Sequence, residues 1–422
     1  MISNRVRLTI ILTVSWFFTV CDRYVTQLLF PIFETFFLIP NELVLIVSTE
    51  AVWWAAYSSS AIIGGLLSDK FLRKHMISVT LFFYFLNTFL ISFATNFILF
   101  IFFRIMSGLF AGTFFPLAIT IVSDAFPEKD KKSKANGLFV SGAVFANAVA
   151  PAIIGELIIG TNNYLFAHEW FPTHFTIVGN WGIIYIIFSI PLLIMAFIVH
   201  IGFNEQEVIK EIDQSDKPPI RSLFNRNLNI LIIFVTLDLF ELWTLQQWLP
   251  YIFTVYFFTG FSGAGTTTTA GGLIGAFGAV VFGLIGGRES AKSDKKKGNK
   301  ITLVIAVCGD IIGLLIFLSL GTLIPRGPYS VIFALLAIML VIFAGTGEYA
   351  ALYTLITESV PPSVSGKTMG LCIGIANFAT VGGLILQGLI GTHSENILII
   401  MWIPIIASII QLPISYLYNP TE

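Results

Sequence analysis

The feature that most constrains this chain is a series of apolar segments, each long enough to cross a lipid bilayer as a helix. A membrane-spanning helix needs about 20 predominantly apolar residues. Of the 422 residues, 56% are hydrophobic and 11% are charged, which is more apolar surface than a water-soluble domain can bury. The sequence therefore predicts an all-α membrane protein in the lipid bilayer. Twelve transmembrane helices are expected near 8–30, 43–68, 75–94, 97–123, 135–159, 177–201, 227–257, 268–287, 301–321, 329–357, 367–391 and 396–418.

Basic residues are distributed unevenly between the two sides of these predicted helices. Of the 23 Lys and Arg residues, Arg326 lies outside, Arg23 and Arg104 lie within helices, and the remaining 20 fall in segments that are cytoplasmic if the N-terminus is inside. The positive-inside rule therefore predicts that both termini are cytoplasmic. Because the termini are short and no organelle address is visible, we expect the cell membrane as the location.

A polar stretch divides the chain into two halves. Residues 202–226 include Pro218 and Pro219 and separate six predicted helices from six. Proline and polar residues between periodic segments are typical of loops. We therefore expect an N-terminal bundle over 1–201, a cytoplasmic linker over 202–226 and a C-terminal bundle over 227–422.

The two halves also repeat one another in sequence. Phe-Ala-Gly-Thr occurs at 110–113 and again at 343–346, and the same offset of 233 relates Lys134 to Lys367. Further matches fall at nearly the same offset in equivalent helices. A single match could arise by chance, but several at near-constant spacing predict two pseudo-symmetric six-helix bundles. An axis normal to the membrane would relate them.

A short basic run joins the second and third predicted helices. It carries the spaced residues Gly65, Asp69, Lys70, Arg73 and Lys74. Gly65 lets a neighbouring helix approach closely, and Asp69 lies where it can reach basic groups or a helix N-terminus. This run resembles the signature loop of the major facilitator superfamily, although Leu72 stands where that family usually has glycine. The resemblance implies the major facilitator fold and a latch that holds the two halves together in one state. The competing interpretation is a simple positive-inside anchor.

Ionisable residues inside the predicted helices are the main candidates for function. Each costs roughly 2.5–3.5 kcal/mol on insertion scales, so such residues usually serve a purpose. The first helix carries a polar stripe at helical spacing, which we expect to face a central cavity. It consists of Thr19, Asp22, Arg23, Thr26 and Gln27.

Helix depth predicts which of these residues meet. Asp22 lies about 21 Å from the cytoplasmic end of its predicted helix. Arg104 lies about 10 Å from the opposite, outer end of its own helix. In a hydrocarbon core about 30 Å thick these depths nearly coincide, so Asp22 can pair with Arg104, in competition with the neighbouring Arg23. Glu241 has the same depth as Asp22 and is expected to face this group from the other half. Asp238 shares the face of Glu241 at a spacing of three residues.

Two interpretations of this polar group remain open. Either Asp22, Arg23 and Arg104 form a fixed structural clamp, or an arginine fork receives a carboxylate or phosphate while Asp22 or Glu241 exchanges protons. Other polar residues are candidates either for the cavity or for hydrogen bonds between helices. They are Asn147, Asn377, Thr380 and Gln387. Glu348 lies beside two glycines that can loosen its helix and is a candidate gate or proton site, whereas Glu156 and Asp310 are expected to be structural.

Aromatic residues in the second and seventh helices also have two interpretations. They could flank a substrate, but anchoring at the membrane interface is the expected use. These residues are Trp53, Trp54, Tyr57, Trp243 and Trp248.

A narrower resemblance covers the first 140 or so residues. Asp22-Arg23, the segment from Arg104 to Pro116 and the Asp69 loop are similar to the anion:cation symporter family. The resemblance implies proton- or sodium-driven transport of organic anions, with Arg23 and Arg104 engaging the anion or a partner carboxylate. Many members carry a coupling glutamate at the position of Ala111. Without it, uniport or exchange stays open unless Asp238, Glu241 or Glu348 substitutes. Spinster-like lipid transporters have a sequence similar to Asp22-Arg23-Tyr24 and are the competing subfamily.

We therefore expect a secondary transporter that works by alternating access, with a small organic anion as substrate and protons as the coupling ion. The alternatives are an exporter of amphipathic, cationic or lipid-like solutes, and a transporter-like receptor that binds without moving its ligand. We find no nucleophile and base set, metal-ligand spacing or phosphate loop, so no enzyme, metal site, cofactor or nucleic-acid partner is expected. The expected oligomeric state is a monomer.

Overall fold

The computed structural model describes most of the chain in segments separated by short gaps. They cover 3–39, 42–68, 71–126, 129–160, 181–204, 224–253, 295–323, 328–361, 364–392 and 397–418, together with 269–270, 273–274, 277–278 and residue 281. Every regular element in these ranges is helical. The predicted linker over 202–226 lies mostly outside the described residues, and the predicted helix over 268–287 is described only in short pieces.

The N-terminal half contains the six helices that the sequence predicts. They are α1 (Asn4–Phe37), α2 (Glu42–Leu67), α3 (Arg73–Ile91), α4 (Phe97–Ala125), α5 (Lys129–Gly160) and α6 (Trp181–Gly202). Asn96 fixes the start of α4, because its side-chain oxygen accepts a hydrogen bond from the Leu99 amide at 2.9 Å. Pro116, Pro151 and Pro191 lie inside helices, as membrane proteins tolerate.

The C-terminal half repeats this arrangement. It contains α9 (Arg226–Tyr251), α11 (Lys295–Leu323), α12 (Pro328–Glu358), α13 (Ser365–Thr392) and α14 (Trp402–Leu417), with the short 3-10 helix η5 (Ile397–Met401) before α14. The start of α9 is capped like that of α4, since Asn225 accepts from the Leu228 amide at 2.8 Å.

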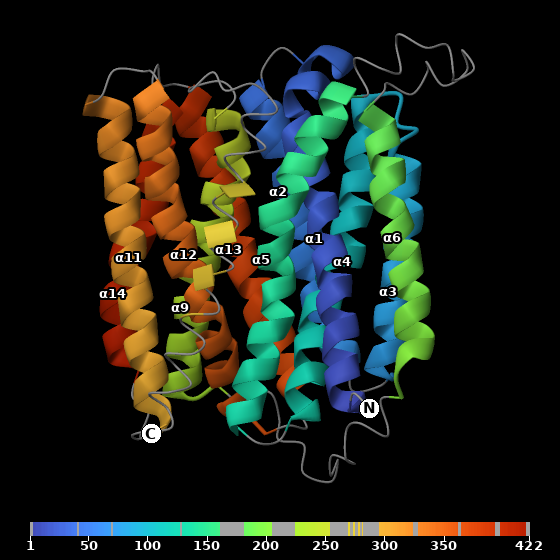
Figure 1. Ribbon diagram of the computed structural model, residues 1–422, viewed down its shortest axis with the longest axis vertical. Coiled ribbons are helices and arrows are strands. Elements are labelled where there is room, and N and C mark those ends of the chain that lie inside the picture. The colour runs from blue at the N-terminus through green and yellow to red at the C-terminus, as the bar shows by residue number, and fades with distance from the viewer. Residues whose placement is uncertain are drawn as a thin grey trace.

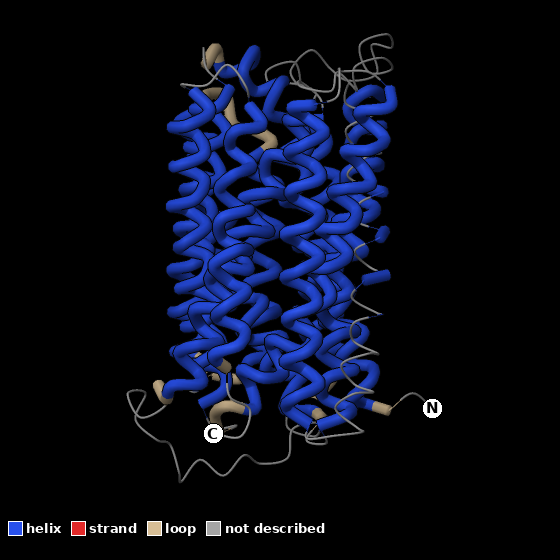
Figure 2. Tube along the Cα trace, turned by 90° about the vertical axis from the view of Figure 1, so that its left-hand side faces the viewer, coloured by secondary structure: helices blue, strands red, loops and turns tan. Residues whose placement is uncertain are grey.

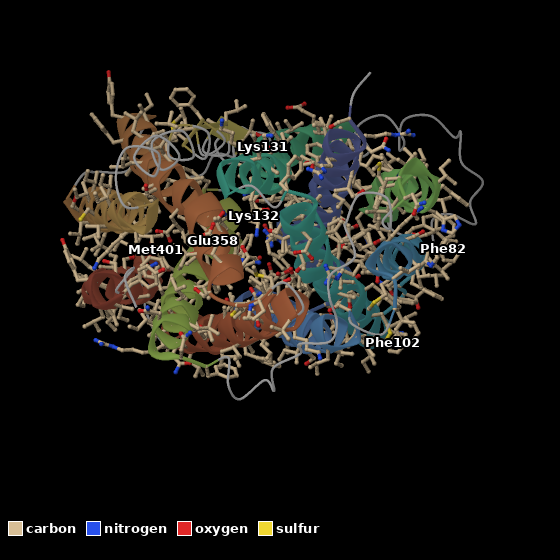
Figure 3. All side chains as sticks on the ribbon, turned by 90° about the horizontal axis from the view of Figure 1, so that it is seen from below. Phe82, Phe102, Lys131, Lys132, Glu358 and Met401 are labelled. Atoms are coloured by element: carbon tan, nitrogen blue, oxygen red, sulfur yellow. The ribbon has the colours of Figure 1, made fainter. Side chains whose placement is uncertain are left out.

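The helices run side by side along the long axis of the molecule (Figures 1 and 2). Nine helices in the described part of the chain are long and apolar enough to cross a membrane. Both termini lie at the same end, which the sequence predicts to be cytoplasmic. Phe82 and Phe102 point outward from α3 and α4 (Figure 3), and each is at least 41% exposed. Such side chains form an apolar outer surface suited to lipid.

The two halves meet most extensively where α2 packs against α13. Gly65 of α2 has Gly366 and Gly370 of α13 directly beside it, and a Cβ atom at Gly65 would lie 2.9 Å from the Gly366 carbonyl oxygen. Small residues allow this backbone approach in a membrane, where packing rather than the hydrophobic effect drives helix association. The glycine that the sequence singles out therefore lies in the contact between the halves, near the end that carries the termini.

Candidate functional site

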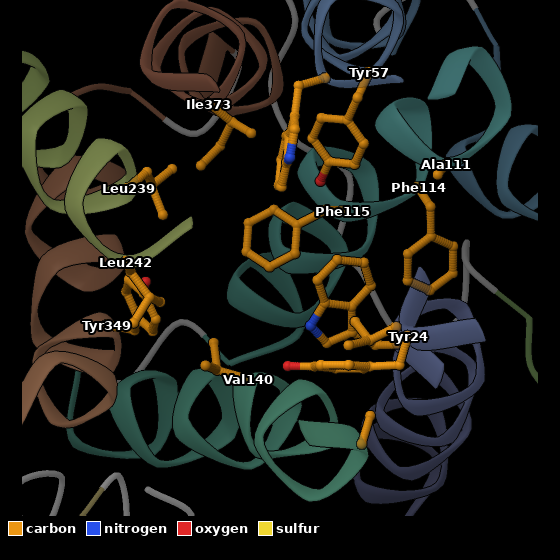
Figure 4. Close-up of a cluster of buried hydrophobic side chains, with 14 of the residues drawn as sticks. Tyr24, Tyr57, Ala111, Phe114, Phe115, Val140, Leu239, Leu242, Tyr349 and Ile373 are labelled. Atoms are coloured by element: carbon orange, nitrogen blue, oxygen red, sulfur yellow. The ribbon is translucent and has the colours of Figure 1, made fainter. Parts of the chain in front are cut away.

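A cavity lies between the two halves, and the non-atom space in and around it, open solvent included, is about 430 Å³. Figure 4 shows Tyr57 and Phe115 of the N-terminal half across this region from Leu239 and Ile373 of the C-terminal half. Helices α1, α2 and α4 supply one wall, and α9, α12 and α13 supply the other. The lining residues are Trp16, Thr19, Val20, Arg23, Trp53, Trp54, Tyr57, Ala111, Phe115, Leu239, Trp243, Tyr353, Ile373 and Asn377.

Arg23 is the charged residue of the cavity wall. Its guanidinium carbon lies 4.0 Å from the ring centre of Trp243 and 5.4 Å from that of Trp54, so the cation is held between aromatic faces from both halves. The side chain is buried, and its Nε and Nη2 atoms have no hydrogen-bond partner among the described residues. Arg23 is therefore a buried positive charge at the cavity that forms no ion pair with a described carboxylate.

The cavity wall also carries other free hydrogen-bond donors. The indole N–H groups of Trp16, Trp53 and Trp54 are buried and have no partner in the described part of the chain. Asn377 adds an unpartnered side-chain oxygen, while its amide nitrogen donates to the Ile373 carbonyl at 2.7 Å. Unpartnered donors thus outnumber unpartnered acceptors around the cavity. A ligand rich in oxygen acceptors would complement these donors.

Arg104 is paired, but with a residue other than the predicted one. Its Nη2 atom lies 2.9 Å from Oε1 of Glu50 on α2, and both side chains are fully buried. Asp22 instead accepts a hydrogen bond from the Tyr84 hydroxyl at 2.7 Å. The prediction of an Asp22–Arg104 pair is therefore wrong, because Glu50 reaches the guanidinium from the neighbouring helix.

Glu50 is the functional candidate that the sequence interpretation missed. It lies seven residues after the start of the second predicted helix at 43, just as Arg104 lies seven residues after the start of the fourth at 97. Both helices run inward from the outer side, so the two residues have the same depth of about 10 Å. The depth argument applied to Arg104 would thus have found Glu50 if every intramembrane acidic residue had been included.

The remaining acidic candidates form a group of their own in the C-terminal half. Asp238 and Glu348 lie within hydrogen-bonding reach of each other, and Gln411 of α14 donates to Glu348 at 3.4 Å. Glu241 and Asp310 complete this acidic cluster, which consists of Asp238, Glu241, Asp310 and Glu348. Two expectations are corrected here. Glu241 points into its own bundle rather than toward Asp22 and Arg104, and Asp310 joins the cluster because α11 packs against α12.

The other polar candidates have local roles in the structure. Gln387 accepts a hydrogen bond from the Trp248 indole at 2.8 Å, which joins α13 to α9. Thr380 donates to the Leu239 carbonyl at 3.4 Å across the same helix pair. Asn147 is buried in α5, its side-chain oxygen has no described partner, and it does not line the cavity.

The aromatic residues of α2 and α9 are placed differently from the expectation. Trp53, Trp54 and Tyr57 are each at most 5% exposed and line the cavity, as does Trp243. Trp248 is fully buried. The expected interface-anchoring role is wrong for these residues, because four of them line the cavity between the halves and Trp248 bonds to Gln387 inside its own half.

The predicted latch is only partly described. Asp69 and Lys70 lie outside the described residues. Arg73 forms an ion pair with Asp124 of α4 at 2.6 Å, and Lys74 donates to the Phe203 carbonyl at the end of α6. These two contacts hold the N-terminal half together, and the direct contact between the halves comes from Gly65.

Metal binding finds no support in the described residues. They contain no group of three or more His, Cys, Asp or Glu side chains that could hold a metal ion.

The fold matches that of known transporters. The family model of the Major Facilitator Superfamily matches residues 12–371, so the chain belongs to this family. The structure resembles the proton:xylose symporter XylE bound to 6-bromo-6-deoxy-D-glucose, with a TM-score of 0.71, 16% identity, and 98% of this chain and 95% of that chain covered. It also resembles a bacterial homologue of the human lysosomal transporter Spinster, with a TM-score of 0.66, 16% identity, and 99% and 98% covered.

One relative comes from the sequence comparison. The sialic acid transporter NanX of Escherichia coli (strain K12) is 25% identical over 290 residues, which is 63% of this chain. The match spans 65% of the length of that relative. The chain is therefore a multi-pass membrane protein, and its family consists of transporters rather than enzymes.

Proposed function

We propose that the protein transports a small organic anion together with protons, and that Arg23 binds the anionic group. The observation that carries this proposal is that the guanidinium of Arg23, at a cavity built from both halves, forms no ion pair with a described carboxylate. Guanidinium groups bind carboxylates through paired, charge-assisted hydrogen bonds. The free N–H groups of Trp16, Trp53 and Trp54 would add donors to the other oxygens of the same substrate.

The walls support a particular shape of anion. Seven of the fourteen lining residues are Trp, Tyr or Phe, and their ring faces suit the flat or apolar face of a cyclic substrate. A carboxylate on a ring, such as a sugar acid, offers both an anionic group for Arg23 and a ring face for the aromatic walls. NanX transports sialic acid according to its name, which is consistent with this class.

Charge balance in the N-terminal half supports coupling to protons. The buried arginines Arg23 and Arg104 are matched by the buried carboxylates Asp22 and Glu50, so the group is neutral when all four are charged. A bound anion adds one negative charge in a region of low dielectric constant, where net charge is costly. A proton on Asp22 would restore neutrality, and proton and anion would then move together. Asp22 would thereby supply the carboxylate that Ala111 does not.

The membrane setting follows from the same proposal. The excess of basic residues in the predicted inner segments supports cytoplasmic termini. A monomer suffices because both cavity walls come from one chain.

The test is proton flux into proteoliposomes that contain a pH dye, with a panel of organic anions added outside. We expect acidification with at least one ring carboxylate in the wild type, its loss in R23Q, and anion movement without acidification in D22N. Lys134→Gln is the matched control, because it removes an exposed cation of the same half that does not line the cavity, and we expect it to retain coupled flux.

The same experiment separates the competing functions. The aromatic walls and the acidic cluster also favour export of an amphipathic cation, whose transport would survive in R23Q. Saturable binding of an anion without flux in either direction would indicate a receptor. Anion flux in R23Q at the wild-type rate would contradict the proposal.

A further inference from the structure

The acidic cluster of the C-terminal half has no role in the anion site. Asp238 and Glu241 of α9, Asp310 of α11 and Glu348 of α12 are each at most 4% exposed. None of them lines the cavity. No Lys or Arg of the described residues forms an ion pair with any of the four.

The oxygen atoms of this cluster lack donors. Each acid has one oxygen without a described hydrogen-bond partner, namely Oδ2 of Asp238, Oε2 of Glu241, Oδ1 of Asp310 and Oε2 of Glu348. The independent feature is Gln411 of α14, which is fully buried and donates to Glu348 through its amide nitrogen. Its side-chain oxygen also has no partner. Five buried acceptor atoms in and beside the cluster therefore lack a matching donor, whereas the cavity wall is rich in donors.

We propose that this cluster is a second proton-binding site, which holds and exchanges protons in the substrate-free transporter. Four negative charges in one buried group would repel each other strongly, and bound protons remove the charge while supplying the missing donors. Protons fit better than a metal ion, because the described carboxylates do not converge with metal-ligand spacing. The inference goes beyond the proposed function, since it concerns proton binding without any anion.

The surroundings contain no described cation to compete for the carboxylates. The cluster is faced by Cys308 of α11 and by Tyr349 and Tyr353 of α12, while α14 contributes the uncharged Ser408 and Gln411. These tyrosines also connect the cluster to the cavity. The rings of Tyr349 and Tyr353 stack at 5.6 Å, and Tyr353 lines the cavity and contacts Phe115 of the other half at 5.3 Å. The two stacked rings therefore form a packed connection between the cluster and the cavity wall.

The test is an infrared pH titration of the purified full-length protein in nanodiscs, without substrate and in sodium-free buffer. Protonated buried carboxyl groups give a C=O band that shifts on deuteration. We expect this band in the wild type and loss of a distinct part of it in E348Q and in D310N. E358Q is the matched control, because Glu358 lies outside the cluster at the end of α12, the helix that carries Glu348. Its substitution should leave the band unchanged.

The outcomes separate this inference from the anion proposal. The band must persist in R23Q, even if that variant or the wild type transports no anion. If E348Q fails to fold, D310N tests the same loss of carboxyl band from another helix. An unchanged band in both cluster variants would overturn the inference. Displacement of the band by added sodium would overturn it in a different way, by identifying the bound cation as sodium.

Discussion

Two arginines in the same half show how the partner of a residue decides its role. Arg104 has a carboxylate at 2.9 Å and lies behind Trp53, with its guanidinium carbon 5.6 Å from that ring centre. Arg23 has only aromatic rings and the cavity. A buried cation that is already neutralised supports structure, whereas one without a described carboxylate can attract an anion. The two arginines that the sequence treats as one fork therefore divide into a structural and a binding residue.

The Glu50–Arg104 pair gives a prediction for stability. E50Q leaves the Arg104 charge buried without compensation, and loss of one partner of a buried pair costs about 3–5 kcal/mol. We expect E50Q to lower the unfolding temperature of the purified protein, followed by intrinsic tryptophan fluorescence. The double variant Glu50→Leu with Arg104→Met removes both charges and should recover most of that loss. An unfolding temperature in E50Q equal to that of the wild type would contradict the pairing.

The site could be predicted from the sequence at the level of residue type and depth, but not of partners. Asp22, Arg23, Asp238, Glu241 and Glu348 all proved to be buried, as their cost in a membrane implies. Their grouping depends on helix rotation, which depth does not give. Glu241 and Asp22 have the same depth, yet they face different clusters because each helix turns its acid toward its own bundle.

At the scale of elements, the contact between α2 and α13 sets how closely the halves can approach. Gly370 lies against the backbone of α2, and a Cβ atom there would fall 2.7 Å from the Ala61 carbonyl oxygen. Backbone atoms cannot yield as a flexible side chain can. The contact therefore requires glycine on both helices at this level.

This contact predicts different effects for two glycines of the same helix. G370A forces α2 and α13 apart and should destabilise the contact between them by about 1–3 kcal/mol, the usual cost of overpacking. G382A is the matched control, since a Cβ atom at Gly382 would meet nothing within 4 Å. We expect thiol labelling of a cysteine placed at Ser68 to become faster in G370A and to stay unchanged in G382A. Equal labelling rates in both variants would contradict this account of the contact.

Most helices follow from hydrophobic length alone, and their ends from local capping. The predicted segment 97–123 becomes α4, which begins after its Asn96 cap and extends to Ala125. The aromatic residues of α2 were harder to place, because Trp53 and Trp54 suit either a membrane interface or a buried face. Only the packing of α2 between α4 and α13 distinguishes these positions.

At the scale of the whole molecule, the halves touch on both sides of the cavity. Gly65 and Gly370 close one side, and Gln27 of α1 bonds to Gln247 of α9 on the side away from the termini. Tyr24 and Gln246 add a bond of 3.4 Å between the same helices. Alternating access requires one set of contacts to open while the other stays closed. The repeat in the sequence predicted two bundles, but not which residues join them.

The contact on the side away from the termini yields a prediction about the transport cycle. Cysteines at Gln27 and Gln247, joined by a cleavable bifunctional thiol reagent, should hold α1 and α9 together and stop flux. Cleavage of the reagent should restore flux, and each single cysteine variant treated alike serves as the control. Undiminished flux through quantitatively cross-linked protein would show that these helices need not separate.

The central claim is that the cavity selects its substrate by negative charge at Arg23. The most direct measurement compares binding of a ring carboxylate with binding of its uncharged amide, in wild type and in R23Q, by quenching of tryptophan fluorescence. A hydrogen bond to a charged group contributes about 1.5–3 kcal/mol, so we predict that the wild type prefers the carboxylate roughly 10- to 100-fold. R23Q should lose this preference. Equal binding of both ligands by the wild type, or an intact preference in R23Q, would contradict the account.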